Sequence, residues 1–422
     1  MVLSALDLLK LGGSTFLPAL VMAPKRVAEV VWDGEAARWS TFHHLKVRKV
    51  LGTEEERLAA LRAPMADVYV VNYDVVPWLV DVFEQGKRWP FRIVVADESS
   101  RLKGFRLNKG RVRAEALSKI ARFTGRWWNL TGTPCPNGLQ DLWGQFWFLD
   151  FGERLKRTYT AYLEAFFQQS PYTRKITPLS GAQEAISGAV KDRTLVLRAT
   201  DWLPVLEPQE IPVEVELPPE ARRVYRAMEK DFFVELENGE VEARNAAAKS
   251  SKLLQITSGS VWDDKRQDHA VHDAKIEALK DILDETGSEP LLVSYWWKFD
   301  PDRILKAFPK EARVYAGPQD EKDFNAGKIR MLLLHAQSAF GLSLHRACRD
   351  VVFYSYNWNA ELWQQMIERV GPARQAQAGL KRVVRVWTIC ARDTIEQDVI
   401  ASNAGKISIE QALKRARARR QT

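Results

Sequence analysis

Short apolar runs alternate with amphipathic stretches along most of the chain. Four runs lie in the first part, at 19–23, 68–71, 92–96 and 127–131, and four in the last part, at 291–295, 331–334, 351–355 and 383–389. Uninterrupted runs such as I-V-V-A are typical of strands buried on both faces, and strands that alternate with helices indicate parallel sheets. The pattern therefore predicts an α/β protein with two lobes.

The stretch between the two series has a different pattern. Residues 152–259 are mainly helical in pattern, and Pro-Pro-Glu opens an amphipathic run over 219–236. Over 211–217, Glu214 and Glu216 alternate with apolar residues, which predicts one half-exposed strand. We therefore expect four parts: a first lobe over 1–150, a mainly helical connector over 151–258, a second lobe over 259–400, and a basic tail over 401–422.

The chain opens with a predicted helix. Leu3, Leu6 and Leu9 recur at helical spacing, which predicts an amphipathic helix over 2–11 that no N-cap residue precedes. The sequence Leu-Gly-Gly-Ser at 11–14 is typical of a helix C-cap.

Composition narrows the class of protein. Of the 422 residues, 46% are hydrophobic and 27% charged, which excludes collagen, coiled coil and disorder as the main state. The net charge of +8 suits a polyanionic partner without requiring one. No apolar run approaches the ~18 residues that span a membrane. Cys135, Cys348 and Cys390 lie far apart with no zinc-site spacing, which favours a reducing, cytoplasmic setting.

The strongest chemical signal is the segment I-V-V-A-D-E-S-S-R-L-K at 93–103. A buried strand ends here in Asp97 and Glu98, and ligands of α/β sheets bind at the carboxyl ends of the strands. Such an Asp can hold Mg²⁺ on a triphosphate, and the adjacent Glu can deprotonate an attacking water. The alternative is an ordinary strand end with solvated acids.

A second segment, N-L-T-G-T-P-C-P-N-G at 129–138, also follows a predicted strand. Its prolines and glycines predict a rigid turn, and the hydroxyls of Thr131 and Thr133 suit contact with a γ-phosphate or with the neighbouring carboxylates. Alone, the segment is typical of a turn. Its combination with D-E-S-S is far rarer than either segment by itself.

These two segments resemble motifs II and III of the superfamily 2 helicase-like ATPases of the Swi/Snf-type branch, and especially its compact phage-encoded members. The resemblance covers nearly the whole chain. The other similar segments are A-L-V-M-A-P-K-R-V-A (19–28, motif Ia), V-V-N-Y-D-V-V (70–76, the next DNA-facing motif), L-L-V-S-Y-W-W-K-F-D (291–300, motif IV), S-A-F-G-L-S-L (338–344, motif V) and W-N-A-E-L-W-Q-Q-M-I-E-R (358–369, motif VI).

The resemblance implies two RecA-like lobes joined by a helical connector, with ATP and Mg²⁺ bound between the lobes of a DNA translocase or helicase. It implies that Asp97 binds Mg²⁺, that Glu98 is the general base, and that Thr131 and Thr133 couple nucleotide state to strand movement.

From the second lobe, the resemblance implies nucleotide contacts by Gly341 of motif V and by Gln365 and Arg369 of motif VI. The family carries a second arginine three residues after the first, where this chain has Pro372; the next arginine is Arg374. Either Arg369 or Arg374 is therefore a candidate arginine finger. Motif V is one residue shorter than usual and has Ser343 where Asn is common.

The largest departure concerns the phosphate-binding loop. The 422 residues contain no G-x-x-x-x-G-K-[ST], so the lysine and the backbone cradle for the phosphates are missing. The resemblance places that loop directly before the first helix, where Met1 stands. Two explanations stay open: a late start site or truncated gene, which an in-frame G-K-T upstream would reveal, and an ATPase-dead variant. In either case we expect a strand missing beside 127–130, a defective first-lobe sheet and negligible ATP turnover.

Basic residues suggest where DNA binds. Residues 101–126 carry nine Lys and Arg against one acid, Glu115, which predicts either a phosphate-tracking stripe or a solvated helix face. The tail K-R-A-R-A-R-R at 414–420 either adds nonspecific affinity or is frayed. The partner expected is DNA, duplex and not read by sequence. The candidate contacts are Lys25, Arg26, Asn72, Arg101, Lys103 and Arg106.

The remaining aromatic residues and two rival functions complete the prediction. Most of the fifteen tryptophans are expected in the core, as the i, i+4 spacing of Trp143 and Trp147 indicates, rather than stacked on bases.

Two other functions stay open. One rival is a DNA-binding protein that keeps the fold without hydrolysis. The other is a Mg²⁺-dependent nuclease using Asp97 and Glu98, which would need further acids that the sequence does not place nearby.

Overall fold

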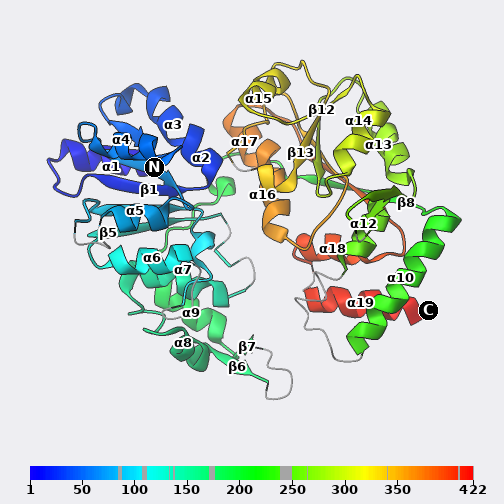
Figure 1. Ribbon diagram of the computed structural model, residues 1–422, viewed down its shortest axis with the longest axis horizontal. Helices are drawn as coiled ribbons and strands as arrows, with labels where there is room; N and C mark the ends of the chain where they lie inside the picture. Colours follow the sequence, from blue (N-terminus) through cyan, green and yellow to red (C-terminus); the bar gives the residue numbers. More distant parts are fainter. Residues whose placement is uncertain are drawn as a thin grey trace. The chain divides into compact units, whose positions relative to one another are not determined.

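The computed structural model describes residues 1–83, 88–106, 112–132, 134–135, 138–170, 176–237, 250–263, 265–339, 341–406 and 409–421. The chain divides into two compact units, Met1–Val196 (unit 1) and Leu197–Thr422 (unit 2). Each unit has its own parallel sheet, helices and apolar core (Figure 1). The finer division at 150, 258 and 400 stays a prediction.

The sheet of unit 1 has five strands in the order β2-β3-β1-β4-β5, all parallel. Every residue of β1 and β3 is buried, as expected of central strands covered on both faces. Strand β5 pairs only with β4 within the described residues, so it forms one edge of this sheet. The strands are β1 Ala19–Ala23, β2 Val47–Lys49, β3 Val68–Asn72, β4 Ile93–Asp97 and β5 Arg126–Leu130.

Helices and a small hairpin complete unit 1. The predicted helix at the start of the chain is confirmed as α1, Val2–Leu11, and its C-cap is confirmed as well: Gly13 has φ +69°, and the Gly13 and Ser14 N–H groups donate to the carbonyls of Lys10 and Leu9. The other elements are α2 Lys25–Val30, α3 Trp32–Arg38, α4 Glu54–Arg62, α5 Val76–Val82, α6 Val112–Ala121, α7 Gln140–Asp150, α8 Tyr159–Phe166, α9 Ala182–Val190, and the strands β6 Phe167–Gln169 and β7 Ile176–Pro178.

The sheet of unit 2 has six parallel strands in the order β12-β13-β11-β14-β15-β8. Strand β8 is the half-exposed strand that the sequence predicted, two residues earlier than expected, because its pairing with β15 sets its limits. The strands are β8 Gln209–Val215, β11 Leu291–Tyr295, β12 Ala312–Val314, β13 Met331–His335, β14 Asp350–Phe353 and β15 Arg385–Ala391, and a separate hairpin joins β9 Ser260–Trp262 to β10 Asp268–Ala270.

The predicted helix over 219–236 is confirmed as α10, Pro219–Glu237. The other helices of unit 2 are α12 Ser251–Ser258, α13 Ala274–Glu285, α14 Asp300–Ala307, α15 Pro318–Asn325, α16 Ala360–Val370, α17 Pro372–Gln377, α18 Ile395–Asn403 and α19 Ile409–Gln421. No helix in the described part of the chain is both long and apolar enough to cross a bilayer.

The basic end of the chain is helical, so the frayed-tail alternative is wrong. In α19, Ala412, Leu413 and Ala416 are buried, and an Arg419 Nη2 atom lies 2.8 Å from Asp398 Oδ2 of α18. Burial of these three apolar side chains stabilises the packing of α19 against the rest of unit 2.

Candidate functional site

The carboxyl ends of four strands bring most of the predicted first-lobe residues to one edge of the unit 1 sheet. The parallel register pairs Ala23 with Asn72, Met22 with Ala96, and Asp97 with Leu130. The chain therefore leaves the sheet at this edge with Lys25 and Arg26 after β1, Asn72 at the end of β3, Asp97 and Glu98 after β4, and Thr131 after β5. Thr133 lies outside the described residues.

Asp97 is half-buried and held from two sides. Its Oδ2 atom accepts a hydrogen bond from Trp32 Nε1 of α3 at 3.0 Å, and its carbonyl oxygen accepts one from the Tyr73 hydroxyl at 2.9 Å. Burial raises the pKa of Asp97, while the hydrogen bonds from Trp32 and from the Glu98 backbone act in the opposite direction. These donors favour the ionised carboxylate, which is the form that binds a cation.

Glu98 adopts the left-handed backbone conformation, with φ 59° and ψ 58°. For a residue with a Cβ atom this conformation costs roughly 1–2 kcal/mol. It turns the chain directly from β4 into the short 3₁₀ helix Ser99–Leu102. Strain of this kind concentrates at functional sites, and here it lies next to the half-buried Asp97.

One side chain that the sequence analysis missed joins the D-E-S-S turn to the T-G-T-P turn. Gln145 of α7 is 2% exposed; its Oε1 accepts from Ser99 Oγ at 2.8 Å and its Nε2 donates to the Pro134 carbonyl at 2.6 Å. The preceding Gly144 lets α7 lie close to the 3₁₀ helix Ser99–Leu102, because a Cβ at this position would lie 2.6 Å from the Leu102 carbonyl oxygen. The signal available in the sequence was the lone polar residue in the run L-W-G-Q-F-W-F.

The predicted DNA contacts differ in exposure. Lys25 and Arg101 are exposed, and the Arg101 guanidinium lies 5.7 Å from the Tyr73 ring centroid. Arg26 and Lys103 are half-buried, and Asn72 is 8% exposed. Arg106 is engaged within unit 1: its guanidinium lies 3.3 Å from the centroid of the Tyr159 ring and donates to the Lys103 carbonyl.

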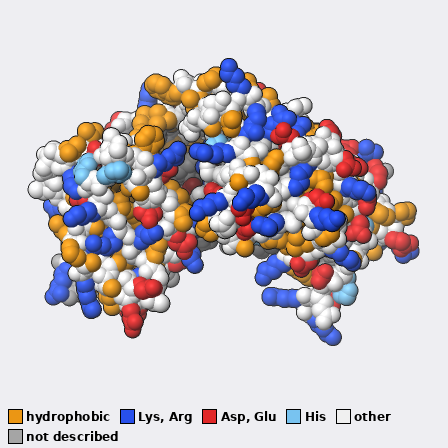
Figure 2. Space-filling model, turned by 90° about the horizontal axis from the view of Figure 1, so that it is seen from above, with side chains coloured by type: hydrophobic (Ala, Val, Ile, Leu, Met, Phe, Trp, Pro, Cys, Tyr) orange, Lys and Arg blue, Asp and Glu red, His pale blue; other side chains and the backbone are white. Residues whose placement is uncertain are grey.

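Charges of both signs are mixed on the face of the molecule that Figure 2 shows. On the face in Figure 2, Lys and Arg side chains form several small groups with Asp and Glu between them. The candidate DNA contacts are therefore individual side chains at the carboxyl edge of the unit 1 sheet.

In unit 2, the residues predicted from motifs V and VI lie together. Arg369 of α16 donates from Nε to the Gln365 carbonyl at 2.9 Å and from Nη1 to the Leu342 carbonyl at 3.2 Å. Arg374 of α17 donates to Ser343 Oγ at 3.1 Å, and burial lowers the pKa of its guanidinium. Both candidate arginine fingers thus contact the loop that Gly341 opens with φ +71°.

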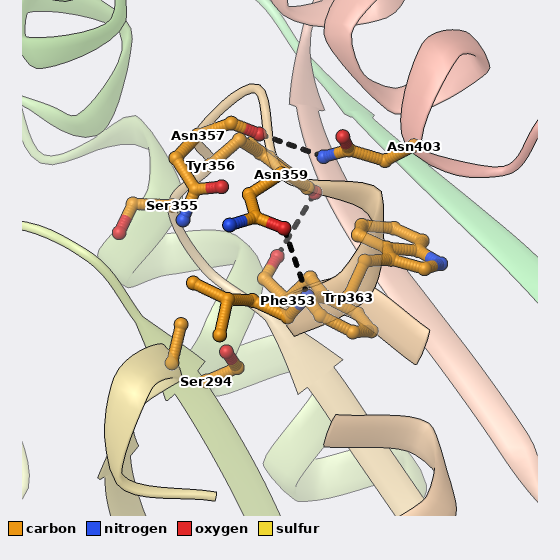
Figure 3. A pocket seen from close by; sticks show the side chains of 10 residues that line it. Ser294, Phe353, Ser355, Tyr356, Asn357, Asn359, Trp363 and Asn403 are labelled. Atoms are coloured by element: carbon orange, nitrogen blue, oxygen red, sulfur yellow. Dashed lines mark hydrogen bonds between the residues drawn. The ribbon is translucent and has the colours of Figure 1, made fainter. Parts of the chain in front are cut away.

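A hollow of about 240 Å³, counted with the solvent at its mouth, lies at the carboxyl edge of the unit 2 sheet (Figure 3). Asn403 Nδ2 donates to the Asn357 carbonyl beside it, and Asn359 Oδ1 caps the N-terminus of α16. None of its ten lining residues is charged. This hollow therefore lacks the chemistry that a triphosphate requires.

The described residues contain no group of three or more His, Cys, Asp and Glu side chains that could hold a metal ion. This finding gives the nuclease hypothesis no support. Mg²⁺ bound to a nucleotide needs only one or two protein carboxylates, because waters and phosphate oxygens complete its coordination. Asp97 at the carboxyl edge fits that kind of site.

Comparison with known proteins decides the family. Residues 2–258 match the family model of the SNF2-related domain. The chain belongs to the SNF2-related family. The resemblance to Swi/Snf-type helicase-like ATPases is thereby confirmed, and the two parallel-sheet units are its RecA-like lobes.

One relative of this SNF2-related chain is similar over nearly its whole length, and two others are longer proteins that match it over part of theirs. A protein designated p41 of Acyrthosiphon pisum secondary endosymbiont phage 1 is 47% identical over 425 residues, covering 99% of this chain and 92% of p41. An uncharacterized ATP-dependent helicase of Mycoplasma genitalium is 24% identical over 410 residues, and the matched region is 36% of that protein. The SWI/SNF-related matrix-associated actin-dependent regulator of chromatin subfamily A member 1 of Mus musculus is 24% identical over 93% of this chain and 38% of its own length.

Among solved structures, the chain is similar to the Sulfolobus solfataricus SWI2/SNF2 ATPase core in complex with dsDNA, at 18% identity and a TM-score of 0.42. The similarity covers 96% of this chain and 83% of that one.

Proposed function

We propose that this SNF2-related protein is a DNA-dependent ATPase that translocates along duplex DNA. The observation that carries the proposal is the shared carboxyl edge of the unit 1 sheet, at which the strand before Asp97 and Glu98 and the neighbouring strand before the exposed Lys25 both end. The name of the Mycoplasma genitalium relative, an ATP-dependent helicase, supports the ATPase part of the proposal.

In this proposal ATP with Mg²⁺ supplies the free energy for movement. Asp97, which the Trp32 indole orients, holds the cation. Glu98 takes the proton from the attacking water, and the Gln145 amide keeps the two turns at a fixed spacing. Thr131 and Thr133 couple the nucleotide state to strand movement. Gly341 and Gln365 contact the nucleotide. Arg369 or Arg374 stabilises the charge on the transferred phosphoryl group.

The second candidate function is a DNA-binding protein that keeps the fold and does not hydrolyse ATP. The observation that favours it is the absence of G-x-x-x-x-G-K-[ST] from the 422 residues. Both candidates share DNA binding, so they are separated by measuring nucleotide binding by residues 1–422 and by a chain extended upstream through a restored phosphate-binding loop.

Residues 1–422 alone are expected to hydrolyse ATP negligibly, because no lysine of a phosphate-binding loop is present to neutralise the phosphates. The measurement is phosphate release with and without duplex DNA, with Glu98→Gln as the blank. Turnover near the ~10 s⁻¹ typical of enzymes, lost in Glu98→Gln, would contradict this expectation and exclude the second candidate.

DNA binding is expected to depend on the carboxyl edge of unit 1. Arg101→Gln should weaken duplex binding at all sequences alike and make the slope of log K against log salt less negative by about one, since one phosphate contact is lost. The matched control is Arg92→Gln, an exposed arginine directly before β4 at the opposite edge of the same sheet. Equal losses in the two variants, or no duplex binding by the wild type, would count against the proposal.

A further inference from the structure

An aromatic pair lies at the carboxyl edge of the unit 2 sheet. Trp296 directly follows β11, and His335 is the last residue of β13. Their rings are stacked, with centroids 5.2 Å apart and planes 25° from parallel. Both side chains are half-buried, so part of the pair is open to solvent at the edge where ligands of parallel sheets bind.

Hydrogen bonds fix this pair in place. His335 Nε2 donates to the Trp296 carbonyl at 3.0 Å, and Nδ1 accepts from the Gln337 N–H at 3.3 Å. These two contacts require the neutral imidazole with its proton on Nε2, and burial lowers the pKa of His335 accordingly. The backbone N–H of Trp296 donates to Ser355 Oγ at 2.7 Å, and the Ser355 hydroxyl donates to the buried carboxylate of Asp300.

Trp296 differs from the fully buried tryptophans in its exposure to solvent. Trp143 and Trp387 are 0% and 1% exposed, and each is surrounded by apolar residues of its unit. Trp296 packs against the unit 2 core with part of its surface but is only half-buried, and the exposed Lys298 follows two residues later. A rigid aromatic surface next to a cation is the combination with which proteins bind unpaired bases and their phosphates.

We propose that Trp296, supported by His335, stacks on an unpaired base of single-stranded DNA, and that Lys298 contacts a phosphate of the same strand. This inference depends on the DNA binding of the proposed function and adds a second ligand form to the duplex. Because the pair is already ordered, a base that stacks on it loses little binding energy to the immobilisation of protein side chains. Stacking is tolerant of base identity, so no sequence preference is expected.

The test compares a dye-labelled oligothymidine with a duplex of equal length in anisotropy titrations of the full chain. Trp296→Ala should weaken single-strand binding roughly 5- to 150-fold, the range for loss of one stacked base, and leave duplex binding within about twofold. Trp296→Phe should retain most of the affinity. The matched control is Trp39→Ala in unit 1, whose side chain is 53% exposed and which should bind both ligands like the wild type.

A second readout does not depend on the stability of Trp296→Ala. Oligothymidine should quench tryptophan fluorescence of the wild type, and Trp296→Phe should lose a clear part of that quenching while still binding. Unchanged quenching in Trp296→Phe, or wild-type single-strand affinity in folded Trp296→Ala, overturns the inference alone when duplex binding is intact. A wild-type chain that binds neither ligand overturns the proposed function together with the inference.

Discussion

Lys275→Met is expected to lower the free energy of unfolding of unit 2 by about 3–5 kcal/mol. Lys275 of α13 and Glu396 of α18 are both 0% exposed, with Nζ and Oε1 2.5 Å apart. The Lys275 ammonium also donates to the Tyr354 carbonyl, and Glu396 accepts from the Ala391 N–H and the Thr257 hydroxyl. Methionine keeps the chain length but removes the cation, so the Glu396 charge would stay buried without its partner.

The free energy of unfolding of unit 2 is measured by urea titration, and unfolding is monitored by a signal such as tryptophan fluorescence. The control is Lys280→Met, an exposed lysine on the same helix, which should change the free energy of unfolding by less than about 0.5 kcal/mol. Adding Glu396→Gln to Lys275→Met should recover part of the loss, because the amide keeps the hydrogen bonds without a charge. A loss below about 1 kcal/mol in Lys275→Met would contradict the argument.

The second large effect is a pH dependence that originates at Asp300. This carboxylate is fully buried at the start of α14 and accepts hydrogen bonds from Ser258 Oγ, Ser355 Oγ and the Trp297 N–H at 2.6–3.0 Å. Burial raises the pKa of Asp300 from 3.8 to about 6, against the opposing effect of these donors and of Lys275. That difference corresponds to about 3 kcal/mol of pH-dependent stability.

The sign follows from proton binding. Between about pH 4 and pH 6 the unfolded chain has lost the Asp300 proton, whereas the folded protein keeps it. Because the folded state binds more protons, the free energy of unfolding should fall as the pH rises through this window. Asp300→Asn should remove that part of the slope, as measured by urea unfolding at several pH values.

A matched control for this slope is Asp302→Asn, an exposed position on the same helix, which leaves Asp300 intact and should keep the wild-type slope. If wild type and Asp300→Asn show parallel curves from pH 4 to pH 7, the carboxyl group does not titrate in this window and the explanation is wrong.

Central strands were predictable from sequence and short edge strands were not. The apolar runs of β1 and β11 match the observed limits because both strands are buried on both faces. Strands β2 and β12 have three residues each and are half-exposed, so V-R-K and A-R-V carry no apolar signal. The place of β8 in the unit 2 sheet depends on pairing with β15, far along the chain, which no local pattern encodes.

The candidate site shows the same division between local and distant information. The sequence predicted that Asp97, Glu98 and Thr131 lie close together, because parallel strands end at a common edge of the sheet. The Trp32 and Gln145 contacts were missed, since they depend on how α3 and α7 pack on the turns after β4. Likewise, the amphipathic packing of α19 requires a partner surface on α18, and a run of arginines does not reveal it.

The route by which the chain enters unit 2 has a mechanical consequence. After Val196 the chain leads through the short 3₁₀ helix Ala199–Asp201 to β8, whose seven residues all pair with β15. Tension applied along this strand would load the whole ladder in shear, with its hydrogen bonds sharing the force, instead of peeling them apart one after another. A force applied through this connection would therefore be transmitted into the whole sheet before its edge strand detaches.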